Sequence, residues 1–158
     1  MPKIRLFLWQ LCHNVLPTRA TLLQRGIYID PVCPGCHSEI EDIDHLFMGC
    51  HMVKKTWDLA VSHQWISSQS LSLLGSSVKE GLHNLHQAHD QSVTRIAMLL
   101  WSIWKSRNAM IFDNDAPKPM GSLIRAKRNW AEWQLRMSVL SPHSTPPCLL
   151  YTSPSPRD

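Results

Sequence analysis

Three cysteines and one histidine in the first third of the chain have the types and spacing of metal ligands. They follow the pattern Cys33-x2-Cys36-x8-His45-x4-Cys50. Thiolate and imidazole are the donors of tetrahedral structural zinc sites, and a two-residue gap lets both thiolates of one turn face the same ion. Four protein donors leave no coordination position for a substrate, so we predict a structural Zn2+ site and not a catalytic one.

The surroundings of this pattern leave alternatives open. His37 and His51 adjoin it, and either could replace His45 or Cys50 as a ligand. The four residues could also be buried free cysteines with a surface histidine, although the complete four-ligand spacing favours zinc. Positions five apart on an ideal helix differ by about 140° of rotation, so the last two ligands need a break between them. Gly49 is expected to provide it.

Two helices are predicted before the ligands. Apolar residues recur at helical spacing from Ile4 to Val15, and Pro17 ends this pattern. A shorter helix is expected between Thr18, as its N-cap, and Gly26, which suits a left-handed C-terminal cap. The residues from Ile27 to Asp30 are extended in character. They are the only part of the chain for which extended structure is expected, and the rest of the expected regular structure is helical.

Three further helices are predicted after the ligands, at about 52–64, 93–112 and 123–137, from apolar residues that recur every three or four positions. Six serines and one glycine between Ser67 and Ser77 predict a linker, so we place a domain boundary there. A helix after Ser77 would have only a thin apolar face. Since every ligand precedes the linker, loss of one is expected to unfold residues 1–64 and to spare the helices beyond.

The predicted fold is therefore mainly α, a small zinc-stabilised helical domain followed by a helical connector and a disordered tail. Its domain limits are 1–66 for the zinc-binding domain, 67–90 for the linker, 91–140 for the connector and 141–158 for the tail. The tail has five prolines in eighteen residues and no periodicity. Its last ten residues resemble translated adapter sequence, so we treat it as non-native and give it no functional role.

Composition and charge narrow the class of protein. Five cysteines are an odd number and no signal peptide precedes them, which argues against a secreted disulfide scaffold and for a reducing, intracellular location, the nucleus included. No apolar stretch approaches the roughly 20 residues that span a bilayer, so no membrane partner is expected. The formal net charge of +4 permits contact with nucleic acid but does not establish it.

The motifs of the first 60 residues resemble the zinc-binding domain that follows the reverse transcriptase domain in plant non-LTR (LINE-type) retrotransposons. They are Pro2 to Trp9, Leu16-Pro17-Thr18-Arg19, Arg25-Gly26-Ile27, Cys33-Pro34-Gly35-Cys36, Glu41, His45-Leu46-Phe47, Cys50 and Trp57. Downstream, Leu100 to Asn108 with Ile111-Phe112 resembles a connector toward a ribonuclease H domain. The resemblance implies a fragment of a longer polyprotein, with its reverse transcriptase and ribonuclease H domains as partners.

Two functions compete, and neither is enzymatic. In the first, the zinc unit aids binding of element RNA or target DNA through five nearby basic residues, Arg5, Arg19, Arg25, Lys54 and Lys55. In the second, the chain is a purely structural or protein-interaction module whose tryptophans are packing residues. Catalysis is not expected, because the 12 acidic residues form no organised metal-binding set and the histidines at 83, 86 and 89 have no organising partner.

Overall fold

The computed structural model describes residues 1–139, so the predicted tail at 141–158 lies outside the described residues. The elements in chain order are α1 (Pro2–Cys12), α2 (Arg19–Gln24), the π-helical turn η1 (His45–Gly49), α3 (His51–Ser62), α4 (Ser68–Leu74), α5 (Val78–Gln87), α6 (Val93–Phe112) and α7 (Pro119–Val139). Residues 1–139 contain no β-strand, only an isolated antiparallel bridge between Val32 and Ile40. The predicted mainly helical class is confirmed.

Local signals place the short helix α2 as the sequence predicts. The Thr18 side chain accepts a hydrogen bond from the backbone N–H of Thr21 at 3.2 Å, which satisfies one of the first N–H groups of the helix. Beyond the other end, Gly26 has a φ of +80°, a conformation that costs glycine little. α2 therefore begins and ends on local sequence chemistry.

Residues 67–90, predicted as a linker, instead contain two helices, α4 and α5. The serines that suggested flexibility include the N-cap of α4, because the Ser67 hydroxyl accepts a hydrogen bond from the Ser70 N–H at 2.9 Å. The start of α5 is capped from a distance: the Asp44 carboxylate accepts the Val78 N–H at 2.9 Å. Leu74 is buried, so the leucines among the serines give this segment an apolar face.

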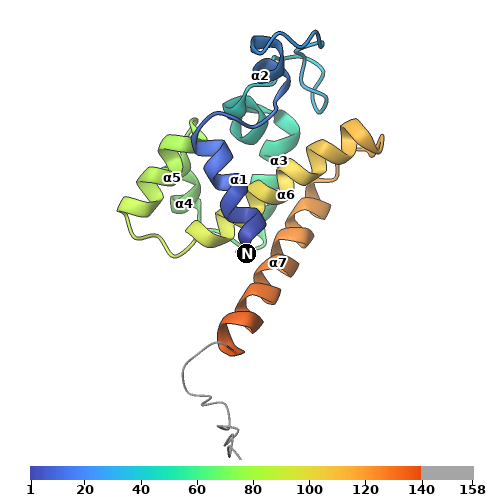
Figure 1. Ribbon diagram of the computed structural model, residues 1–158. Helices are drawn as coiled ribbons and strands as arrows, with labels where there is room; N and C mark the ends of the chain where they lie inside the picture. Colours follow the sequence, from blue (N-terminus) through green and yellow to red (C-terminus); the bar gives the residue numbers. More distant parts are fainter. Residues whose placement is uncertain (140–158) are drawn as a thin grey trace, which may run out of the picture.

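α6 is the central helix of the described residues, with α1 packed against it and α7 running beside it (Figure 1). The pair formed by α4 and α5 lies on one side, and α2 lies at one end with the ligand loop, residues 31–41, which carries Cys33 and Cys36. Buried residues before and after 67–77 belong to one hydrophobic cluster. The Phe7 ring, for example, lies edge-on to Phe47 at 5.9 Å and to Trp101 at 5.4 Å. No described helix has the length and apolar character that crossing a membrane requires.

At Gly81 the backbone of α5 lies against the end of α4, and this contact leads to a testable prediction. A Cβ at this position would clash with the backbone carbonyl group of Leu74, so the two helices would have to separate. We expect Gly81→Ala to lower the free energy of unfolding by about 1–3 kcal/mol, although alanine is the better helix former. Urea denaturation followed by circular dichroism would measure this.

The matched control is Gly121→Ala in α7, where the new methyl would lie 3.2 Å from the Lys118 Cβ, a side-chain contact that a small shift relieves. It should change the free energy of unfolding by less than about 1 kcal/mol. Equal effects of the two substitutions would contradict the close approach of α4 and α5.

Candidate metal centre

The first two ligands lie in a tight turn held by a short antiparallel pairing. The Cys33 N–H donates to the Glu39 carbonyl at 2.7 Å, and the Glu41 N–H donates to the Pro31 carbonyl at 2.9 Å. Inside this loop the His37 N–H donates to the Cys33 carbonyl at 2.9 Å. Cys33 and Cys36 are thereby presented from one turn, as their two-residue spacing predicts.

The second pair is brought together by the π-helical turn η1. The Cys50 N–H donates to the His45 carbonyl at 2.8 Å, a bond that spans five residues and not the four of an α-helix. Widening the turn by one residue brings Cys50 back over His45, which an unbroken α-helix could not do. Gly49 lies close against the His45 ring, since a Cβ at this position would lie 3.2 Å from the His45 Nδ1. The predicted break is therefore a π-helical turn ahead of α3.

The donor atoms of the four predicted ligands gather at one point. The Sγ atoms of Cys33, Cys36 and Cys50 and a ring nitrogen of His45 all lie within 4.8 Å of one another. The Cys33 and Cys50 sulfurs are 4.0 Å apart, and the Cys36 sulfur is 3.3 Å from the His45 Nε2. In a tetrahedral site with Zn–S bonds of about 2.3 Å, two sulfurs are about 3.8 Å apart. The donor set fits zinc in both chemistry and size.

The surroundings orient these donors. The His45 Nδ1 lies 3.1 Å from the Glu39 carboxylate, which holds the ring so that Nε2 faces the cysteines. The Cys36 sulfur accepts the Ser38 hydroxyl at 3.3 Å, and the Cys33 sulfur accepts the Gly35 N–H at 3.4 Å. Carboxylate-to-histidine and donor-to-sulfur contacts of this kind are typical outer-shell support for a metal site.

Burial and proton sharing also suit a closed site. Cys33 and Cys50 are each only 2% exposed. The hydrogen bond from the Cys33 thiol to Cys50 lowers the pKa of Cys50, assisted by the backbone N–H groups of Met52 and Val53 at the start of α3. The same bond, together with burial, raises the pKa of Cys33. Cysteine binds a metal as the thiolate, so binding of zinc here must release the thiol protons.

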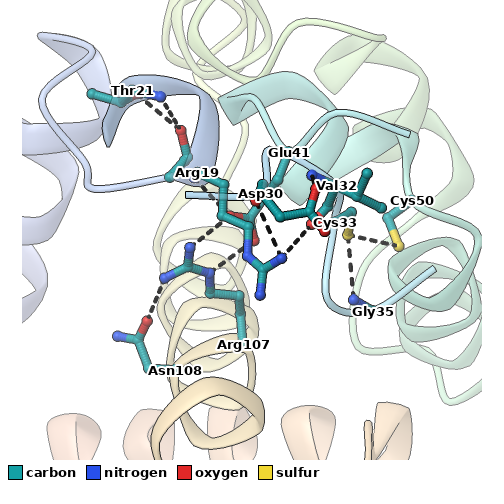
Figure 2. A network of polar contacts seen from close by, with 11 residues as sticks. Arg19, Thr21, Asp30, Val32, Cys33, Gly35, Glu41, Cys50, Arg107 and Asn108 are labelled. Carbon is teal, nitrogen blue, oxygen red and sulfur yellow. Dashed lines mark hydrogen bonds and ion pairs between the residues drawn. The ribbon is translucent and has the colours of Figure 1, made fainter. Parts of the chain in front are cut away.

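The ligand loop is joined to α6 by a buried ion pair that sequence reasoning missed (Figure 2). The Arg107 Nε donates to Glu41 Oε1 at 2.8 Å, and Nη2 bonds the other carboxylate oxygen, which also accepts the Arg19 N–H at 2.9 Å. Glu41 is fully buried and Arg107 is 4% exposed. A signal existed, because Arg107 lies four residues after Ile103 on the buried face of α6, and a buried charge requires a partner.

Four of the five basic residues predicted to contact nucleic acid lie in α1, α2 and α3, Arg25 directly follows α2, and their environments differ. Arg5 on α1 and the two α3 residues Lys54 and Lys55 are exposed. The Arg19 guanidinium donates to the Val32 carbonyl at 2.8 Å and so holds α2 to the ligand loop, as Figure 2 shows. Arg25, which is exposed, donates to the Val15 carbonyl at 3.4 Å. Two of the five thus make contacts within the fold.

A closed set of three cysteine sulfurs and one imidazole nitrogen defines this site as one of the structural zinc type. Residues 1–57 match the protein family described as zinc-binding in reverse transcriptase. The match covers all four donors and extends into α3. No curated protein and no solved structure matches the chain. Residues 1–57 are therefore similar to a zinc-binding domain found in reverse transcriptases, and the cluster of four donors together with this match indicates zinc as the cofactor.

Proposed function

We propose that this chain is a non-catalytic, structural zinc-binding module of a reverse transcriptase polyprotein from a plant non-LTR retrotransposon, and that it helps the polyprotein hold element RNA or target DNA. The observation that carries the structural role is the closed donor set. Three sulfurs and one imidazole nitrogen supply every ligand of a tetrahedral ion, so no position is left for a reacting water or substrate.

The link to α6 extends this structural role beyond the ligand loop. Glu41, which directly follows the bridged residue Ile40, is paired with Arg107 in the segment that resembles a connector toward a ribonuclease H domain. An ion in the loop would therefore order the loop and, through this pair, fix its position on α6. This supports a module that sets the relative position of the reverse transcriptase and ribonuclease H domains, which are its proposed partners. The proposed location of the module is intracellular and includes the nucleus.

The nucleic-acid role is supported by the excess of basic over acidic residues. The salt dependence of RNA affinity would test it. A 20-nucleotide single-stranded RNA carrying a fluorophore would be titrated with the zinc-loaded chain at 50 mM and 200 mM salt. We expect binding that weakens at least about tenfold over this range, because basic side chains that neutralise phosphates release counterions. Absent or salt-independent binding would contradict this role.

One observation favours the second candidate, a structural or protein-interaction module without nucleic-acid binding. Large apolar residues are exposed on α1 and in and after α2, namely Leu6, Trp9, Leu23, Ile27 and Tyr28. An apolar surface of this kind is typical of a protein-interaction site. A chain that binds the reverse transcriptase domain but leaves the RNA unbound in the titration would support this candidate.

A further inference from the structure

A groove runs between the first turn of α1, the middle of α6 and the length of α7, away from the zinc ligands. Its volume is about 590 Å³. The charged side chains that line it are Lys3, Lys105, Arg125, Arg128, Glu132 and Arg136. The N-terminal end of α1 meets α6 and α7 here (Figure 1). Three helices thus bring together basic residues that are up to 133 positions apart in the sequence.

This groove carries the charge excess of the protein. Its five basic residues and one acidic residue give a formal charge of +4, which equals the formal charge of the whole chain. Residues 1–139 hold 15 lysines and arginines and 11 acidic residues, so ten of each sign lie outside the groove and cancel in the formal charge. The groove alone therefore has a formal charge as large as that of the described residues together, as expected for a polyanion-binding site.

The spacing of the charged residues along α7 explains why they all line the groove. Arg125, Arg128, Glu132 and Arg136 follow one another at steps of three and four residues, so they share one face of the helix. The Arg125 guanidinium donates to the Ser102 carbonyl at 3.2 Å, which holds this face of α7 against α6. The other four basic residues of the groove are exposed, so they can contact an anion.

Trp101 adds an aromatic ring to the groove. It lies one helical turn before Lys105 on α6, is half-buried, and is held edge-on to the Phe7 ring at 5.4 Å. A fixed aromatic ring beside basic side chains is the combination that binds single strands, in which the bases are available for stacking while the phosphates meet lysine and arginine.

The surface beside the zinc ligands has the opposite character. Glu39, Asp42 and Asp44 line a hollow there with His45, and Lys54 is the only lysine or arginine among its lining residues. Phosphate groups would be repelled by this acidic rim. Charge complementarity therefore favours the groove over the zinc unit as the place where a nucleic-acid strand binds.

We propose that the groove between α1, α6 and α7 binds the phosphate backbone of a single-stranded nucleic acid, with Trp101 stacking on a base. The inference rests on the proposed nucleic-acid role and assigns it to a surface separate from the zinc site. Lys3, Lys105, Arg128 and Arg136 are the phosphate contacts. Four contacts to a single strand predict an affinity that falls about 50-fold between 50 mM and 200 mM salt.

The test compares two double charge reversals in the full zinc-loaded chain. Lys105→Glu with Arg128→Glu changes two exposed groove residues, and Lys54→Glu with Lys55→Glu makes the same charge change on exposed residues of α3. For the 20-nucleotide single-stranded RNA, we expect the groove variant to lose more than tenfold in affinity and at least half of the salt slope. The α3 variant should lose less than about threefold. Trp101→Leu should lose about tenfold with the salt slope unchanged.

The outcomes separate this inference from the function on which it rests. An unaltered chain that fails to bind the RNA would overturn both. Salt-dependent binding that the α3 variant loses as strongly as the groove variant would overturn the groove and leave the nucleic-acid role standing. Tighter binding to a duplex of the same length, or a Trp101→Leu variant that is folded by circular dichroism and binds normally, would overturn the assignment to a single strand.

Discussion

Replacement of Cys50 by serine is expected to unfold the chain on both sides of residues 67–77. A structural zinc site contributes an apparent binding free energy of about 10–16 kcal/mol at neutral pH, whereas a domain of this size is stable by about 5–15 kcal/mol. Serine is a good N-cap for α3, so the loss would come from the metal and not from the helix start. Native mass spectrometry should find one zinc per unaltered chain and none in the variant.

The structure predicts that more of the chain unfolds in this variant than the sequence alone suggested. Sequence reasoning predicts that only residues 1–64 unfold, but Phe7 packs on Trp101 and Glu41 is paired with Arg107, so the two segments share a core. Hydrogen exchange should therefore show lost protection near Trp57 and near Trp104 together. Protection retained near Trp104 alone would restore the predicted division into two units.

The control for this experiment is Cys12→Ser, the same chemical change in a half-buried cysteine of α1 that is not a ligand. It should leave the zinc content at one ion per chain. Its free energy of unfolding should change by about 1 kcal/mol or less, the usual size for a substitution that breaks no metal site. Unfolding of this variant to the same degree would show that the Cys50 result does not report on zinc.

Arg107→Met is expected to lower the free energy of unfolding by about 3–5 kcal/mol, because it leaves the fully buried Glu41 carboxylate without its counter-charge. The measurement is urea denaturation of the zinc-saturated chain. The four donors are untouched, so zinc content should remain one ion per folded chain. A loss of stability without a loss of zinc would show that the ion pair holds the ligand loop on α6 and is not needed for metal binding.

Two further variants make this measurement specific. Adding Glu41→Gln to Arg107→Met removes the unpaired charge but keeps an acceptor for the Arg19 N–H, so the double variant should be more stable than Arg107→Met alone. Lys118→Met breaks the exposed ion pair with Asp115 and should cost no more than about 1 kcal/mol. If Arg107→Met costs as little as Lys118→Met, the buried pair does not stabilise the interface between loop and α6.

The sequence by itself predicted the four candidate metal ligands and determined the strongest helices. Donor chemistry and spacing identify Cys33, Cys36, His45 and Cys50 without knowledge of the fold, because a small closed site depends on local chain geometry. The helix predicted at 93–112 coincides with α6 for a similar reason, since a 3.6-residue apolar repeat is a local signal. The Thr18 cap of α2 is also local.

Only the tertiary structure decided which distant residues meet. Glu41 and Arg107 are 66 positions apart, and Asp44 caps α5 from 34 positions away. Composition led us to predict a linker at 67–90, because serine is common in flexible segments, and the buried face of α4 and α5 becomes evident only against the rest of the core. The basic groove likewise exists only where α1, α6 and α7 meet. Local periodicity shows which face of a helix is apolar, but the partner of that face depends on the packing of the whole chain.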